Sequence, residues 1–184
     1  MKKLLIVLIA AAIFAPGVAA LQLKVEPDQR YLLLATAKTG TMQKELDDAA
    51  AKGYCVLVGS PTTGPEMAVF LEKLAEPPNT YKYKLLATSL TTTMEKELNE
   101  TGAQGYRLLV RTMVSKIRFL GVVEIVAILE KEPNSTKKFE YKLLAARLTT
   151  TLQKELDEAM SQGYVILGMV SRAEHMVILE KESN

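Results

Sequence analysis

Histidine and cysteine are the side chains best suited to metal binding and nucleophilic catalysis, and the chain has one of each, His175 and Cys55. A zinc site usually takes four ligands, so a metal ion here would also need carboxylates. A Ser-His-Asp or Cys-His arrangement would depend entirely on His175 meeting a nucleophile from another part of the chain. His175 instead stands at an apolar strand position, where a structural histidine is the common case. We therefore predict no catalytic residue, no metal ligand and no cofactor-binding residue.

Carboxylates occur in two arrangements that could serve chemistry. Two neighbouring pairs are Asp47-Asp48 and Asp157-Glu158. Adjacent residues on a helix do not face each other, so neither pair converges on one substrate. Three glutamates recur at the same place in related segments, and these are Glu66, Glu124 and Glu174. They could gather a cation around a threefold axis, although duplication alone also explains their recurrence. A hydrolytic enzyme that uses carboxylates and His175 is therefore the less favoured alternative.

A basic and apolar stretch is the strongest candidate for a binding surface. Between residues 107 and 124 the chain has no acidic residue before Glu124. Its basic residues and its aromatic residue are Arg107, Arg111, Lys116, Arg118 and Phe119. Exposed charge beside large apolar groups suits a protein partner or an anionic envelope surface. The alternative is a long hairpin that packs against its own chain.

Four sequence blocks recur three times in the same order and define an internal repeat. Tyr-x-Leu-Leu-Ala starts at residues 31, 83 and 141, and Lys-Glu-Leu starts at residues 44, 96 and 154. Gly-Tyr follows at residues 53, 105 and 163, and Leu-Glu-Lys closes each copy at residues 71, 129 and 179. Proline-containing linkers separate the copies. We predict repeats at 21–79, 80–135 and 136–184, called here copy 1, copy 2 and copy 3.

Each copy predicts the element order β-α-β-β. The first block is a strand pattern, and an apolar stripe at helical spacing follows it in Met42, Leu46, Ala49 and Ala50. The glycine of each Gly-Tyr pair ends the helix in the left-handed conformation. Thr-x-x-Glu at 92–95 and Thr-x-x-Gln at 150–153 predict capping boxes. The second strands are expected at 55–58, 108–112 and 165–170.

The third strands, expected at 67–71, 125–129 and 176–179, are apolar on both faces. Such a strand is normally covered on both sides, and one helix covers only one face. Another copy must therefore cover the second face. We predict an α+β fold of two-layer units that share a core, in a pseudo-threefold or a stacked assembly. A unit of about 50 residues would also be marginally stable alone.

The repeat resembles a small bacterial domain family of unknown function. Copy 2 carries Tyr-Lys-Leu-Leu, then Glu-Leu-Asn-x-x-Gly-x-x-Gly-Tyr-x-Leu, then a closing strand that ends in Glu-Lys. Members of the family read roughly Trp-Glu-Tyr-Lys-Val-Val, then Leu-Asn-x-Leu-Gly-x-Glu-Gly-Trp-Glu-Leu-Val. This chain has tyrosine where the family commonly has tryptophan, and it has no tryptophan at all. The resemblance implies a two-layer α+β unit and implies no catalytic residues.

The N-terminus predicts export. Met1-Lys2-Lys3, an apolar run at 4–15 and Pro-Gly-Val-Ala-Ala at 16–20 form a signal peptide, 1–20. The apolar run is too short to span a bilayer, which needs about 20 apolar residues. Removal of 1–20 balances the acidic and basic residues, which argues against a nucleic acid partner. A single cysteine excludes an internal disulfide, and we expect Cys55 to be buried.

We therefore predict a non-catalytic binding or scaffolding module that is exported, either to the periplasm or out of the cell. Once the signal peptide is cleaved, we expect it not to be an integral membrane protein. Its partner surface is expected on the 107–119 stretch. The alternatives are a small-ligand or metal binder at the junction between copies and the hydrolytic enzyme described above.

Overall fold

The computed structural model describes residues 29–75, 81–117, 121–171 and 174–183. The predicted signal peptide lies outside these residues, as do Arg118 and Phe119 of the predicted partner surface.

Each copy forms a small antiparallel sheet and one helix in the predicted order. Copy 1 contains β1 (Tyr31–Thr36), α1 (Thr39–Ala51), β2 (Tyr54–Pro61) and β3 (Met67–Lys73). Copy 2 contains β4 (Lys82–Thr88), α2 (Thr91–Gly102), β5 (Arg107–Leu108), the 3-10 turn η1 (Val110–Thr112), β6 (Val114–Ile117) and β7 (Val123–Lys131). Copy 3 contains β8 (Lys138–Ala146), α3 (Thr149–Ser161), β9 (Val165–Ser171) and β10 (His175–Ser183). The α+β fold with three repeated units is confirmed.

The third strand of each copy lies in the centre of its sheet. The strand orders are β1-β3-β2, β4-β7-β5 and β8-β10-β9, and β6 also pairs with β7. The first strand of every copy is therefore an edge strand, with its outer edge turned away from its own sheet.

The C-terminal ends of the helices agree with the sequence prediction, and the N-terminal ends do not. Gly53, Gly105 and Gly163 have φ values of 85°, 87° and 89°, the left-handed conformation that was predicted. The capping boxes are wrong, because α2 and α3 begin after Leu90 and Leu148 without a side-chain cap. The Glu95 carboxylate instead contacts the next copy.

The second strand of copy 2 is broken where a continuous strand at 108–112 was expected. β5 ends at Leu108, the 3-10 turn follows, and pairing with β7 resumes in β6. The buried Thr112 hydroxyl holds this turn, since it donates to the Leu109 carbonyl at 2.7 Å and accepts from the Ile128 amide at 3.1 Å. The additional residues of the middle hairpin are partly absorbed here.

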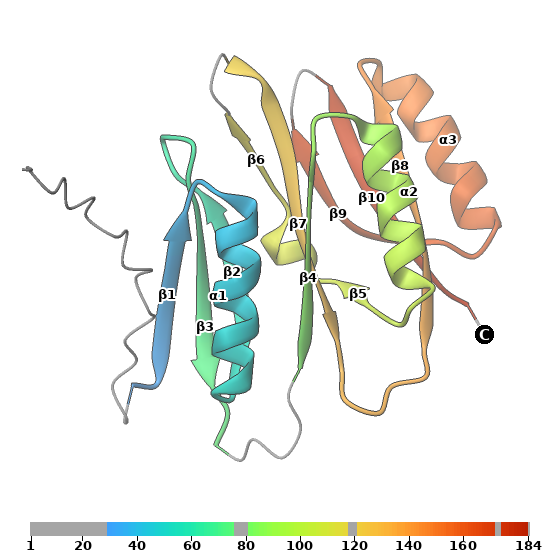
Figure 1. Ribbon diagram of the computed structural model, residues 1–184. Helices are drawn as coiled ribbons and strands as arrows, with labels where there is room; N and C mark the ends of the chain where they lie inside the picture. The colour runs from blue at the N-terminus through green and yellow to red at the C-terminus, as the bar shows by residue number, and fades with distance from the viewer. Residues whose placement is uncertain (1–28, 76–80, 118–120, 172–173, 184) are drawn as a thin grey trace, which may run out of the picture.

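Figure 1 shows that the three copies lie in a row. Neighbouring copies also share hydrophobic cores. Helix α1 contacts its own sheet and β4 of the next copy, and α2 in the same way contacts β4 and β8. The first core thus combines Leu46 and Val56 of copy 1 with Tyr83 and Ile128 of copy 2. The second core joins copies 2 and 3, whereas the described residues of the third core all belong to copy 3.

The predicted shared core is therefore present, in the stacked rather than the threefold arrangement. Glu66 and Glu174 directly precede β3 and β10, and Glu124 lies near the start of β7. Because the three copies form a row, these glutamates do not surround a common axis.

Candidate functional site

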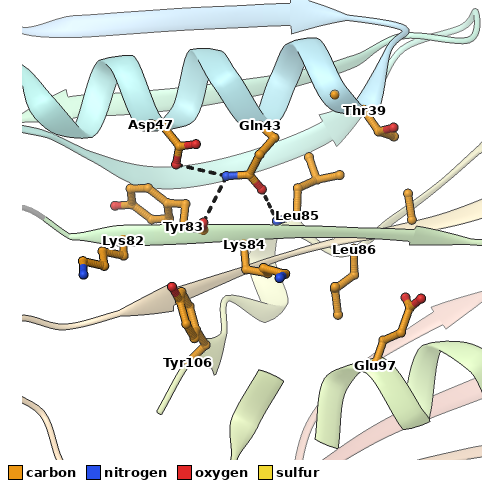
Figure 2. A pocket seen from close by; sticks show the side chains of 12 residues that line it. Thr39, Gln43, Asp47, Lys82, Tyr83, Lys84, Leu85, Leu86, Glu97 and Tyr106 are labelled. Atoms are coloured by element: carbon orange, nitrogen blue, oxygen red, sulfur yellow. Dashed lines mark hydrogen bonds between the residues drawn. The ribbon is translucent and has the colours of Figure 1, made fainter. Parts of the chain in front are cut away.

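The helix of copy 1 docks on the edge strand of copy 2 through one polar side chain. Gln43 on α1 accepts a hydrogen bond from the Leu85 amide at 2.8 Å and donates to the Tyr83 carbonyl at 3.0 Å, and Figure 2 shows both. It also donates to Asp47 at 3.0 Å. An edge strand presents unpaired backbone groups. Gln43 satisfies two of those groups on β4 as a neighbouring strand would.

The junction between copies 2 and 3 uses the helix position of Gln43, which is Glu95 in α2, and adds Asn99 one turn later. Glu95 accepts from the Leu143 amide at 2.7 Å. The Asn99 side chain donates to the Tyr141 carbonyl and accepts from the Tyr141 amide, each at 2.8 Å. These side chains cover the edge of β8, so the two junctions are built alike.

A buried tyrosine forms the second link at each junction. The Tyr83 hydroxyl donates to Glu130 at 2.7 Å and accepts from the Val56 amide of copy 1 at 3.0 Å. At the next junction the corresponding groups are Tyr141, Glu180 and the Leu108 amide. Burial raises the pKa of both phenols, so both hydroxyls stay protonated and able to donate.

An open cleft of about 690 Å³ lies at the junction of copies 1 and 2, along the outer edge of β4. Lys82 and Lys84 on β4 line it together with the carboxylates of Asp47 and Glu97. The described residues of its lining include no histidine or cysteine. The cleft can therefore offer hydrogen bonds and charges of both signs to a small polar ligand.

The described basic residues of the predicted partner surface are bound within the chain. Arg107 pairs with the buried Glu180 of copy 3 at 2.8 Å, and Arg111 donates to the Val56 carbonyl of copy 1 at 3.0 Å. Lys116 is 3% exposed, which corrects the expectation that it projects. Its ammonium group donates to the Ala37 carbonyl at 2.8 Å and lies 3.5 Å from the Glu124 carboxylate.

His175 and Cys55 lie on different sheets and do not meet. His175 is exposed at the start of β10. Cys55 on β2 is half-buried, a correction to the expected full burial, and its thiol donates to the Glu72 carbonyl at 3.5 Å. Within the described residues no group of three or more His, Cys, Asp or Glu side chains could hold a metal ion.

We expect Cys55 to react slowly with an alkylating reagent in the native protein. Burial, followed by the Glu130 and Glu72 carboxylates, raises the pKa of its thiol. Less thiolate is therefore present at pH 8 than in the unfolded chain, and the thiolate is the reactive form. Native labelling should accelerate at a higher pH than labelling of the denatured chain does. Equal rates and equal pH profiles in both states would contradict this environment.

The two ends of the row expose the surfaces that the junctions bury. At the copy 1 end, Tyr31 and Leu33 are 48% and 51% exposed, whereas Tyr83, the counterpart of Tyr31, is 3% exposed. We call this sheet face the sheet end, formed by Tyr31, Leu33, Val58 and Phe70. At the copy 3 end, an exposed or half-exposed surface surrounds α3. We call it the helix end, formed by Leu152, Gln153, Leu156, Met160 and Ile166.

The docking role of Gln43, Glu95 and Asn99 is not among the predictions from the sequence. Each of these residues directly follows an apolar position of the helix stripe, Met42, Met94 or Leu98. A polar side chain in that place, repeated beside the stripe that packs on the next copy, is the signal that could have revealed it.

No family model, curated protein or solved structure matches this chain, so the resemblance to the small bacterial family stays a prediction. Among the described residues, no helix has both the length and the apolar character required to cross a membrane.

Proposed function

We propose that this protein is an exported, non-catalytic binding or scaffolding module whose binding surfaces are the two ends of the row. One observation carries the proposal. Equivalent faces are buried between copies inside the chain and exposed at its ends.

The sheet end is a continuous apolar strip across all three strands of the first sheet. Leu33 on β1 and Val58 on β2 are both cross-strand neighbours of Phe70 on the central strand β3. Phe70 is 45% exposed. Stacked repeats usually need a polar outer face on the terminal copies to remain soluble. A terminal face that stays apolar favours contact with a protein partner.

Binding of a small polar ligand in the cleft along β4 is the second candidate. The cleft offers charges of both signs, but Gln43 and Asp47 in its wall already bond to each other and Gln43 bonds to β4. A ligand would have to compete with these bonds, so the ends of the row are the stronger candidate.

Site-directed photo-crosslinking in the producing cell tests the proposal. A photoreactive residue at Leu33 or Ile166 reports the two ends, and one at Leu90 is the matched control. Leu90 is also an exposed apolar residue but precedes α2 in the middle copy. We expect the photoreactive residue at either end to crosslink this chain to an exported protein. We expect no crosslinked product from position 90. Equal adducts at all three positions, or none at either end, would refute the proposal.

A further inference from the structure

We propose that each end of the row binds the opposite end of a second copy of this chain, so that chains associate head to tail. This inference rests on the proposed function, because it names the partner of the same two surfaces. In it, the helix end of one molecule packs on the sheet end of the next in the way that copy 1 packs on copy 2.

The apolar parts of the two ends correspond to groups that already pack together. Sequence alignment of the copies equates Leu33 and Phe70 of the sheet end with Leu85 and Ile128, which pack in the first core. It equates Ile166 of the helix end with Val56 and Leu108, which are 1% and 4% exposed. Ile166 is 49% exposed. Association would therefore bury the same positions that both internal junctions bury.

The polar groups of the helix end are arranged as in the internal junction. Gln153 on α3 donates to Asp157 at 2.7 Å, as Gln43 on α1 donates to Asp47. Gln43 also bonds to the backbone of β4, and its counterpart Gln153 is exposed. In the proposed contact Gln153 would reach the backbone of β1 in a second molecule.

The sheet end carries the matching groups. Tyr31 and Glu72 are cross-strand neighbours on β1 and β3, as the linked pair Tyr83 and Glu130 are on β4 and β7. In the proposed contact the Tyr31 hydroxyl takes the role of Tyr83 and accepts from the Ile166 amide. The Tyr31 carbonyl now accepts from the Gln29 side chain at 2.8 Å, which Gln153 would replace.

Charge also matches across the proposed contact. Lys82 and Asp47 line the same cleft at the internal junction, and their counterparts at the ends are Arg30 and Asp157. Arg30 pairs with Glu72 at 2.8 Å, but its side chain is 70% exposed. An exposed pair of this kind is weakened by water, so Arg30 can turn towards Asp157 of the second molecule.

One position differs between the ends and the internal junctions. Met160 occupies the place of Ala50 and Gly102, where the following copy approaches closely. Methionine is unbranched and flexible, so it can turn aside, but it makes the contact looser. Two separate molecules also lose translational and rotational freedom on association. We therefore expect reversible assembly that depends on concentration.

The contact is heterologous, since different surfaces of the two molecules meet. Such a contact leaves one sheet end and one helix end free in every open assembly. The products are consequently chains or closed rings, and a dimer is only the first step.

Sedimentation velocity of the chain from Leu21 onward, which retains every described residue, tests the inference. The parent should form species larger than a dimer as its concentration rises. Leu33→Asp places a charge in the sheet end and Ile166→Asp places one in the helix end, so each variant loses binding at that end. Each variant alone should therefore be monomeric. An equal mixture of the two should form dimers and nothing larger, because each variant keeps one intact end. Leu90→Asp should assemble as the parent does.

Circular dichroism and thermal midpoints like those of the parent show that the variants fold, and Met160→Glu replaces Ile166→Asp if that variant does not. A parent that stays monomeric up to its solubility limit would overturn the inference. Association that survives in one end variant but not in the other would indicate contact between like ends and would also overturn it. If the photo-crosslinks at Leu33 join only other proteins, the proposed function stands and self-association fails.

Discussion

Replacement of Gly102 by alanine is expected to destabilise the protein by about 2 kcal/mol or more, because it forces copies 2 and 3 apart. Gly102 ends α2 at the place where this helix meets β8. A Cβ atom there would lie 2.2 Å from the Phe139 carbonyl oxygen and 3.0 Å from the Tyr141 ring. The first obstacle is a backbone atom, which cannot turn aside as a long side chain can.

The sign of this effect is opposite to the usual one. Alanine stabilises a helix relative to glycine by up to about 1 kcal/mol where space allows. Gly40 in α1 has nothing within 4 Å of an added Cβ atom and serves as the matched control. Chemical denaturation should therefore show a lower midpoint for Gly102→Ala and an equal or higher midpoint for Gly40→Ala. If both variants are as stable as the parent, the close contact of α2 with β8 is wrong.

The shared core could be predicted because the third strands are apolar on both faces. One helix leaves one such face uncovered. In copies 2 and 3 the preceding copy covers it, whereas in copy 1 it stays exposed as the sheet end. The choice between a row and a threefold arrangement could not be made from the sequence. The three copies are nearly alike, and their sequences do not indicate whether copy 3 packs against copy 1.

The docking residues were hidden by an ambiguity of local pattern. Glu95 follows a threonine at capping spacing, and glutamate at that position also faces the next copy once the helix is formed. The local sequence pattern indicates only the capping interaction, and it therefore predicts that the Glu95 carboxylate bonds within its own helix. A contact with Leu143 depends on tertiary packing. The sequence pattern of one helix does not contain it.

The burial of Lys116 could not be predicted from the run of basic residues for a related reason. A run of basic residues with one acid at its far end suggests an exposed surface. The hairpin, however, brings that acid back, because Lys116 on β6 is the cross-strand neighbour of Glu124 on β7. A lysine that meets a carboxylate in this way can be buried with its charge, whereas burial of an isolated charged lysine is costly.

Lys116→Met is expected to destabilise the protein by about 3–5 kcal/mol, since loss of one member of a buried ion pair leaves the other charge in a poorly solvated place. Both side chains are nearly inaccessible, at 2% exposure for Lys116 and 7% for Glu124. The substitution also removes the donor to the Ala37 carbonyl, which links β6 to copy 1. The loss should therefore weaken the junction of copies 1 and 2.

A second substitution separates charge burial from packing. The double variant Lys116→Met/Glu124→Leu should recover much of the stability, because apolar side chains often replace a buried ion pair at little cost. Lys138→Met, on an exposed strand position, should change stability by no more than about 0.5 kcal/mol. Denaturant unfolding of the four proteins measures these differences. If Lys116→Met is as stable as the parent, Lys116 is solvated. The exposed basic surface predicted from the sequence would then be correct.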